Sequence, residues 1–65
     1  MKITVNGTAT EVAAKDLPGV LHELGYGDGK VATAVNERFV PVSARSGAVL
    51  QPGDRLEVVT PRQGG

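Results

Sequence analysis

Two glycines, Gly64 and Gly65, close the sequence, and their position suggests chemistry at a carboxyl terminus. Glycine has no Cβ, so such a segment can enter a narrow channel and adopt backbone angles that other residues avoid. The carboxylate of Gly65 would then be sterically open to attack a phosphoryl group. The stretch from Pro61 to Gly65 spans at most about 17 Å when extended, which is enough to reach into the active site of a second protein. We therefore interpret the tail as a substrate for another protein.

The chain itself carries few groups suited to catalysis. His22 is the only histidine and lies off the apolar face of the expected helix, where a solvent-facing role is the ordinary one. The glutamates are spread over separate elements, and the aspartates adjoin glycine, proline or a helix start, where turns and caps explain them. Cysteine is absent, which excludes a disulfide, a thiolate metal site and a cysteine nucleophile. We expect no catalytic residue, no metal site and no bound cofactor, and so no enzyme.

Length and charge narrow the class of protein further. A chain of 65 residues is one small domain with little room for an enclosed active site. Its seven basic and seven acidic residues cancel and are scattered, which argues against a nucleic-acid partner. No apolar run approaches the roughly 20 residues that span a bilayer, and the N-terminus lacks the apolar stretch of a signal peptide. We expect a cytoplasmic protein without membrane contact.

A hairpin and one short helix are predicted for the first part of the chain. Alternating apolar residues indicate a strand over residues 1–5, and Asn6-Gly7 is a strong turn signal before a returning strand over 8–12. Apolar residues then follow the spacing of one helix face, namely Leu17, Val20, Leu21 and Leu24. Leu17 precedes a proline and is interpreted as the helix cap. Gly25 suits the left-handed position after the last turn.

The remaining elements are predicted to be strands and loops. Apolar runs indicate strands over residues 31–35, 39–40 and 55–60. Residues 36–38 form the turn between the first two of these strands, and residues 43–47 are expected to be irregular. The alternation in the last strand directs its even-numbered apolar residues toward the core and its odd-numbered residues outward.

Together these elements predict an α+β fold, in which one mixed sheet of four to five strands is covered on one face by one main helix. The first and last strands would lie side by side and parallel, which describes a β-grasp roll. Residues 1–60 would form this domain, and residues 61–65 a flexible tail. The expected core joins helix and sheet through Leu17, Val20, Leu21, Leu24, Ile3, Val5, Val35, Leu56 and Val58.

Several short motifs occur in an order and spacing that point to a family. They are Val5-Asn6-Gly7, Leu21 to Leu24, Val31 to Asn36 followed by Val40-Pro41, Pro52 to Val59, and the final Gly64-Gly65. With this pattern the chain resembles the ThiS family of sulfur carrier proteins, which are ubiquitin-like β-grasp proteins. The resemblance covers nearly the whole length.

The resemblance implies that Gly65 is the residue that is modified. A ThiF-like adenylating enzyme, using ATP and Mg²⁺, would convert its carboxylate into an acyl-adenylate. A sulfur donor, expected to be a cysteine persulfide on another protein, would displace AMP and leave a thiocarboxylate. A ThiG-like synthase would use that sulfur to build the thiazole ring of thiamine. The residues expected in the partner's channel are Gly64, Gln63 and Arg62.

A docking surface is expected on the outward face of the sheet. Val59 points away from the core if its neighbours point inward, and Phe39 is one of only two aromatic residues. Apolar and aromatic side chains of this kind anchor protein interfaces. Val59 and Phe39 are therefore the candidate docking residues.

Other functions remain open on the sequence alone. The nearest is a MoaD-like carrier for molybdopterin synthesis or a carrier for cysteine or another sulfur metabolite. A ubiquitin-like modifier would be joined to lysines through Gly65 and would give higher-mass conjugates. A binding module that is never activated would be indifferent to removal of Gly64 and Gly65.

Overall fold

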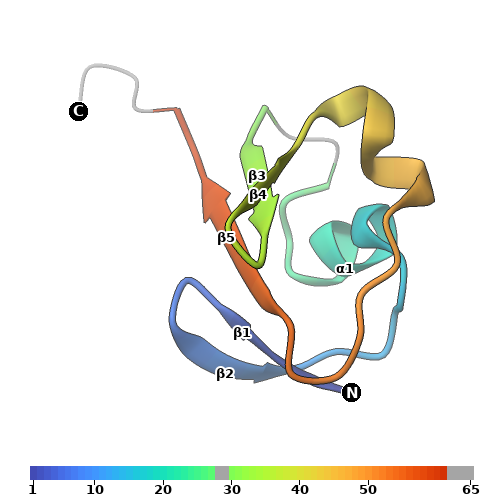
Figure 1. Ribbon diagram of the computed structural model, residues 1–65, viewed down its shortest axis with the longest axis vertical. Helices are drawn as coiled ribbons and strands as arrows, with labels where there is room; N and C mark the ends of the chain where they lie inside the picture. The colour runs from blue at the N-terminus through green and yellow to red at the C-terminus, as the bar shows by residue number, and fades with distance from the viewer. Residues whose placement is uncertain (28–29, 62–65) are drawn as a thin grey trace.

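A single five-stranded sheet, one α-helix and one 3₁₀ helix are the regular elements in the part of the chain that the computed structural model describes, residues 1–27 and 30–61 (Figure 1). The strands lie in the order β2-β1-β5-β3-β4. The predicted α+β architecture, a mixed sheet with one main helix, is confirmed. The elements are β1 (Lys2–Val5), β2 (Thr8–Glu11), α1 (Leu17–Glu23), β3 (Ala32–Val35), β4 (Arg38–Val40), the 3₁₀ helix η1 (Val42–Gly47) and β5 (Arg55–Val59).

The last strand, β5, occupies the centre of the sheet. It runs parallel to β1, with Val5 opposite Leu56, and antiparallel to β3, with Val35 opposite the same Leu56. The predicted parallel pairing of first and last strands is therefore correct. Because both neighbours of β5 are themselves in hairpins, the strand ties the two halves of the chain together.

Both hairpins turn on an asparagine in the left-handed region. Asn6 has φ 51° and is followed by Gly7 at 85°, while Asn36 has φ 51° and is followed by Glu37 at 71°. Two successive positive φ angles are the geometry of a tight turn whose twist matches its strands. Asparagine tolerates this region better than most residues, which explains why both turns begin with it.

The helix begins at Leu17, and its N-cap lies one residue earlier than predicted. Asp16 is the N-cap, and its side chain accepts a hydrogen bond from the Gly19 N–H at 3.1 Å. The interpretation of Leu17 as the cap is wrong, because the Asp16 carboxylate satisfies a free N–H of the first turn and leaves Leu17 buried inside the helix. Gly25 takes φ 93° after the last turn, as predicted.

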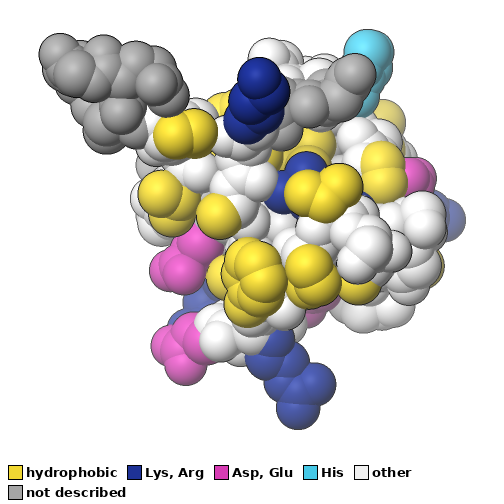
Figure 2. Space-filling model, turned by 90° about the horizontal axis from the view of Figure 1, so that it is seen from above, with side chains coloured by type: hydrophobic (Ala, Val, Ile, Leu, Met, Phe, Trp, Pro, Cys, Tyr) yellow, Lys and Arg dark blue, Asp and Glu magenta, His cyan; other side chains and the backbone are white. Residues whose placement is uncertain are grey.

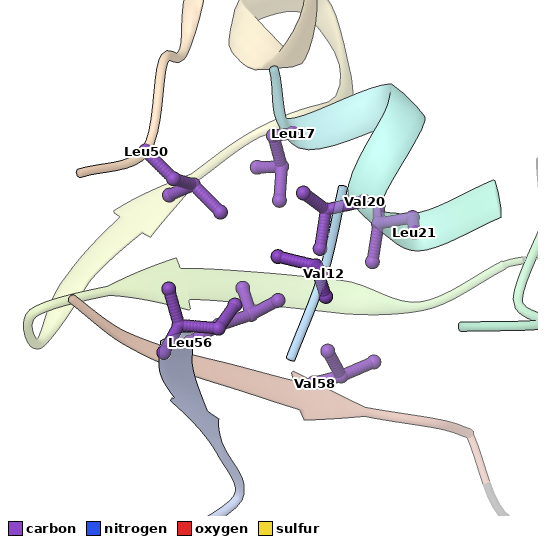
Figure 3. Packing of buried hydrophobic residues seen from close by; sticks show 8 residues of the cluster. Val12, Leu17, Val20, Leu21, Leu50, Leu56 and Val58 are labelled. Atoms are coloured by element: carbon purple, nitrogen blue, oxygen red, sulfur yellow. The ribbon is translucent and has the colours of Figure 1, made fainter. Parts of the chain in front are cut away.

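The core lies between α1 and the sheet, where apolar side chains of both layers point toward one another (Figure 3). Val5, Leu24 and Val35 are predicted core residues, but in the structure they are half-buried and pack against the edge of the core. Two residues not expected are fully enclosed, Val12 and Leu50. The buried set is Ile3, Val12, Leu17, Val20, Leu21, Leu50, Leu56 and Val58.

Backbone pairing explains how Leu50 enters the core. Its N–H donates to the Lys15 carbonyl at 2.8 Å, and the Leu17 N–H donates to the Ala48 carbonyl at 2.9 Å. These bonds attach residues 48–50 to the start of α1. Nothing in the local pattern around Leu50 signals this long-range pairing.

The segment expected to be irregular is the 3₁₀ helix η1. Arg45 in this helix is 8 % exposed, and its guanidinium donates to the carbonyl of Val31 and, at 3.3 Å, to Thr33 Oγ1. The Thr33 hydroxyl in turn donates to the Val40 carbonyl at 2.8 Å. The Arg45 bonds attach η1 to Val31 and β3, and the Thr33 bond joins β3 to β4. Tertiary contacts thus order a segment whose composition favours none of the regular elements.

Candidate functional site

The strand β5 leads to the C-terminal end of the described chain. Figure 1 shows β5 running toward the end of the molecule that lies opposite the N-terminus. Val59 ends the strand, and Thr60 and Pro61 follow as exposed residues. The residues predicted for modification and channel binding, Gly65, Gly64, Gln63 and Arg62, lie outside the described residues.

Strand register brings the two predicted docking residues to the same face of the sheet. Phe39 lies opposite Ala34 on β3, and Ala32, two residues earlier on that strand, lies opposite Val59 on β5. Directly opposed residues share a face, and residues two apart on a strand also share one. Phe39 is 69 % exposed and Val59 64 %, because the opposite face carries the core. We call Ala32, Ala34, Phe39 and Val59 the outer patch.

A shallow apolar groove borders the outer patch where the tail leaves. Its volume is about 480 Å³. Ala32 and Val59 belong to both features, and Val42 of η1, which is 71 % exposed, also lines the groove. The full lining is Lys30, Val31, Ala32, Val42, Val59 and Pro61. Figure 2 views this end of the molecule and shows hydrophobic side chains exposed across its middle, with acidic and basic side chains around them.

Charged residues flank these apolar surfaces. Glu57 on β5 lies opposite Ala34 and so shares the face of the outer patch. Arg55 and Glu37 form an exposed ion pair with N and O 3.7 Å apart. Lys30 adds a positive charge to the groove. An apolar centre with charges at its margin is the usual composition of a protein-binding surface.

The last two residues of β5 are bound to neighbouring segments on both edges of the strand. On one edge Val59 pairs with Ala32 of β3. On the other, the Asn6 side chain accepts from the Val58 N–H at 2.8 Å and donates to the Val58 carbonyl at 3.2 Å. We call this pair of bonds the Asn6 clasp. These contacts therefore fix the position in the sheet of the residues that directly precede the tail.

The histidine and the acidic side chains of the described residues do not gather at one place. His22 is exposed on α1, as expected. Across residues 1–27 and 30–61, no three histidine, aspartate or glutamate side chains come together to hold a metal ion. Within the same residues, no helix is long and apolar enough to cross a membrane. What this part of the molecule offers is an apolar surface beside the root of a tail.

Comparison with protein families covers almost the entire chain. A model of the ThiS family matches residues 3–65, a range that includes the two terminal glycines. The chain belongs to the ThiS family.

A solved structure supports the same relationship. The ThiS-family fold described above is similar to the crystal structure of the thiamine biosynthesis protein ThiS from Geobacter metallireducens, with a TM-score of 0.83. The two sequences are 25% identical, and the match covers 100% of each chain. A comparison with curated proteins finds no match.

Sequence reasoning about this ThiS-family chain missed part of the surface beside the tail. Val42, Lys30 and Pro61 line the groove but were not proposed as docking residues. The signal available was an apolar valine directly after Pro41, outside any predicted element. Its position against Val59 depends on the attachment of η1 to β3, which no local pattern reveals.

Proposed function

We propose that this ThiS-family chain is the sulfur carrier of thiamine biosynthesis and that partner enzymes supply all of the catalysis. The observation that carries the proposal is the family match, because it extends through Gly64 and Gly65. The full-length similarity to a thiamine biosynthesis protein supports the choice of pathway. The exposed apolar surface at the root of the tail supports a function that depends on docking.

The first proposed step activates the Gly65 carboxylate. A carboxylate is a poor acyl donor, so a ThiF-like enzyme must first join it to AMP. One carboxylate oxygen attacks the α-phosphorus of ATP, the bond to the β-phosphate breaks, and pyrophosphate leaves with its electron pair. Mg²⁺ on the partner enzyme would neutralise the phosphate charge during this step. The product is an acyl-adenylate at Gly65.

The second proposed step exchanges AMP for sulfur. The terminal sulfur of a cysteine persulfide on a donor protein attacks the acyl carbon and AMP leaves. The resulting acyl disulfide is reduced by a second thiol, which forms a new disulfide with the donor sulfur and releases the thiocarboxylate. With inorganic sulfide as the donor, the thiocarboxylate forms directly. A ThiG-like synthase then takes the sulfur for thiazole synthesis.

The body of the chain supplies recognition in this scheme. The outer patch and the adjoining groove would dock on the adenylating enzyme, with Val59 and Phe39 as anchors. The tail would then lie in the enzyme's channel, with Arg62, Gln63 and Gly64 along its walls. Docking is thus assigned to the sheet face beside the end of β5, and delivery to the tail that follows this strand.

Intact-mass measurement tests the proposal directly. The chain is incubated with a ThiF-like enzyme, ATP, Mg²⁺ and sulfide, and we expect a mass gain equal to the exchange of one oxygen for one sulfur. Deletion of Gly65 should abolish the gain, and Gly65→Ala should slow it strongly without affecting folding, because a Cβ narrows the fit at the channel. A known carrier in the same reaction shows that the enzyme is competent.

The alternatives give different results in the same assay. An unchanged mass beside a modified control carrier would contradict activation by this enzyme. Higher-mass conjugates through Gly65 in a cell extract would indicate a protein modifier. If the thiocarboxylate forms, a comparison of a ThiG-like synthase with a molybdopterin synthase decides the pathway, and transfer to the latter alone would contradict the assignment to thiamine.

A further inference from the structure

The Asn6 clasp extends the hydrogen bonding between β1 and β5 beyond the last residue of β1. β1 ends at Val5, and the Asn6 backbone N–H still donates to the Leu56 carbonyl at 2.9 Å. Two residues farther along β5, the Asn6 side chain bonds both the N–H and the carbonyl of Val58. A carboxamide carries the same donor and acceptor as a peptide unit. The side chain therefore takes the place of the next residue of a parallel strand.

The turn supplies the geometry for this contact. Asn6 is in the left-handed region at φ 51°, the first position of the hairpin turn. An aspartate at this position would keep an acceptor for the Val58 N–H but would set a carboxylate against the Val58 carbonyl. A glycine would keep the backbone angle and lose both bonds.

The position of the clasp connects it to the tail. Val58 is the last residue of β5 that is buried in the core, and Val59 of the outer patch follows it directly. In the described part of the chain, Val58 is also the last residue of β5 that bonds to the β1–β2 hairpin. A docked partner would contact Val59 on the face of the sheet while it receives the tail from the same strand end. The orientation of that strand end therefore relates the docking surface to the direction in which the tail departs.

We propose that Asn6 is a positioning residue for activation of the tail, a role that rests on the function proposed above. Asn6 is assigned no part in the chemistry at the terminal carboxylate. It holds the root of the tail in one orientation relative to the docked body, so that a larger fraction of encounters places the terminus in the channel. Such preorganisation raises the rate of the bound complex rather than its affinity.

Asn36 is a matched control at the other end of the same strand. It also begins a hairpin turn at φ 51° and is exposed. Its side chain also makes two hydrogen bonds, accepting from the Arg55 N–H at 2.9 Å and donating to Asp54 Oδ1 at 3.1 Å. Arg55 begins β5, whereas Val58 lies next to its end. Asn6→Gly and Asn36→Gly therefore each remove two side-chain hydrogen bonds, at opposite ends of β5.

The test compares steady-state adenylation of the two variants at a temperature where both are folded. We expect Asn6→Gly to lower kcat about tenfold with KM within about twofold of wild type, because the outer patch is intact. Asn36→Gly should leave both constants within about twofold of wild type. Asn6→Asp should fall between wild type and Asn6→Gly. Equal effects of the two glycine variants, or a wild-type kcat for Asn6→Gly, would overturn the proposal.

Backbone ¹⁵N relaxation of the free protein separates this inference from the proposed function. Asn6→Gly should raise the fast mobility of the Thr60 amide, and Asn36→Gly should leave it unchanged. If wild type is not adenylated beside a competent control carrier, the proposed function fails together with the activation role of Asn6. A selective rise in Thr60 mobility would then show that Asn6 still orients the tail root, and equal mobility would overturn that part as well.

Discussion

The carboxylate of Glu23 fastens α1 to the segment that precedes it. Its two oxygens accept hydrogen bonds from the Ala13 N–H at 3.0 and 2.9 Å, and one of them also accepts from the Ala14 N–H at 3.0 Å. The bond from Ala14, followed by that from Ala13, lowers the pKa of Glu23 below its ordinary value. Hydrogen bonds to the charged form have this effect because they favour ionisation.

This lowered pKa predicts a pH dependence of stability. A carboxyl whose pKa is lower in the folded state stabilises the fold above its unfolded pKa, about 4.3 for glutamate, and loses that contribution as the pH falls through the folded value. Glu23→Gln should therefore lower the free energy of unfolding at pH 7 and have a much smaller effect near pH 3. Urea unfolding of both proteins at the two pH values measures the difference, and equal differences would contradict the assignment.

A pair of exposed valines tests the outer patch at the level of one side chain. Val59 lies in the patch and is 64 % exposed, whereas Val49 lies outside it and is 61 % exposed. Val59→Ser should raise KM for adenylation about fivefold, the effect of removing an interface anchor worth about 1 kcal/mol. Val49→Ser should leave KM unchanged. A similar KM for the two variants would mean that docking uses another surface.

At the level of elements, α1 contains a glycine where helix propensity favours alanine. An added Cβ at Gly19 would lie 2.9 Å from Ala14 Cβ and 3.0 Å from Asp16 Oδ1. The Ala14 Cβ is fixed to the backbone and cannot swing away, so the helix would have to shift. The close approach of α1 to the preceding segment therefore requires glycine at this position.

In the variant Gly19→Ala, the higher helix propensity of alanine opposes the steric cost of the added Cβ. Alanine gains about 1 kcal/mol in helix propensity, and overpacking costs about 1–3 kcal/mol. We expect a net loss of about 1 kcal/mol in the free energy of unfolding. Gly47→Ala in η1 is the control, because a Cβ there meets nothing within 4 Å, and it should be neutral or slightly stabilising. A more stable Gly19→Ala variant would show that the helix relaxes freely.

The elements also show where sequence reasoning succeeds. Alternation and turn signals predict the strands and both asparagine turns, because these depend on residues close in the chain. Apolar periodicity does not distinguish Asp16 from Leu17 as the N-cap of α1, because the choice depends on a hydrogen bond that the Asp16 side chain accepts. The 3₁₀ helix depends on Arg45 reaching Val31 and Thr33, which are distant in sequence. Its order is a tertiary effect and has no local signature.

At the level of the whole molecule, one part of the candidate site could be predicted from the sequence and another part could not. Val59 could be proposed from strand phase and Phe39 from its aromatic side chain, and the register shows that both are exposed on one face of the sheet. The groove could not be predicted, since Val42 reaches it through η1 and Pro61 through the end of β5. Surfaces built from one sheet face follow from alternation, whereas surfaces between elements require the packing itself.

The central place of β5 has a consequence for the synthesis of the protein. The ribosome makes this strand after the other four, yet both hairpins depend on it for their pairing partner. A nascent or prematurely terminated chain without β5 has two isolated hairpins with open edges, an arrangement that is marginally stable in water. It also lacks Val59 and hence a complete outer patch. On the proposed function, translation must therefore pass the last strand before a docking partner can recognise the chain, and prematurely terminated products would not compete for the activating enzyme.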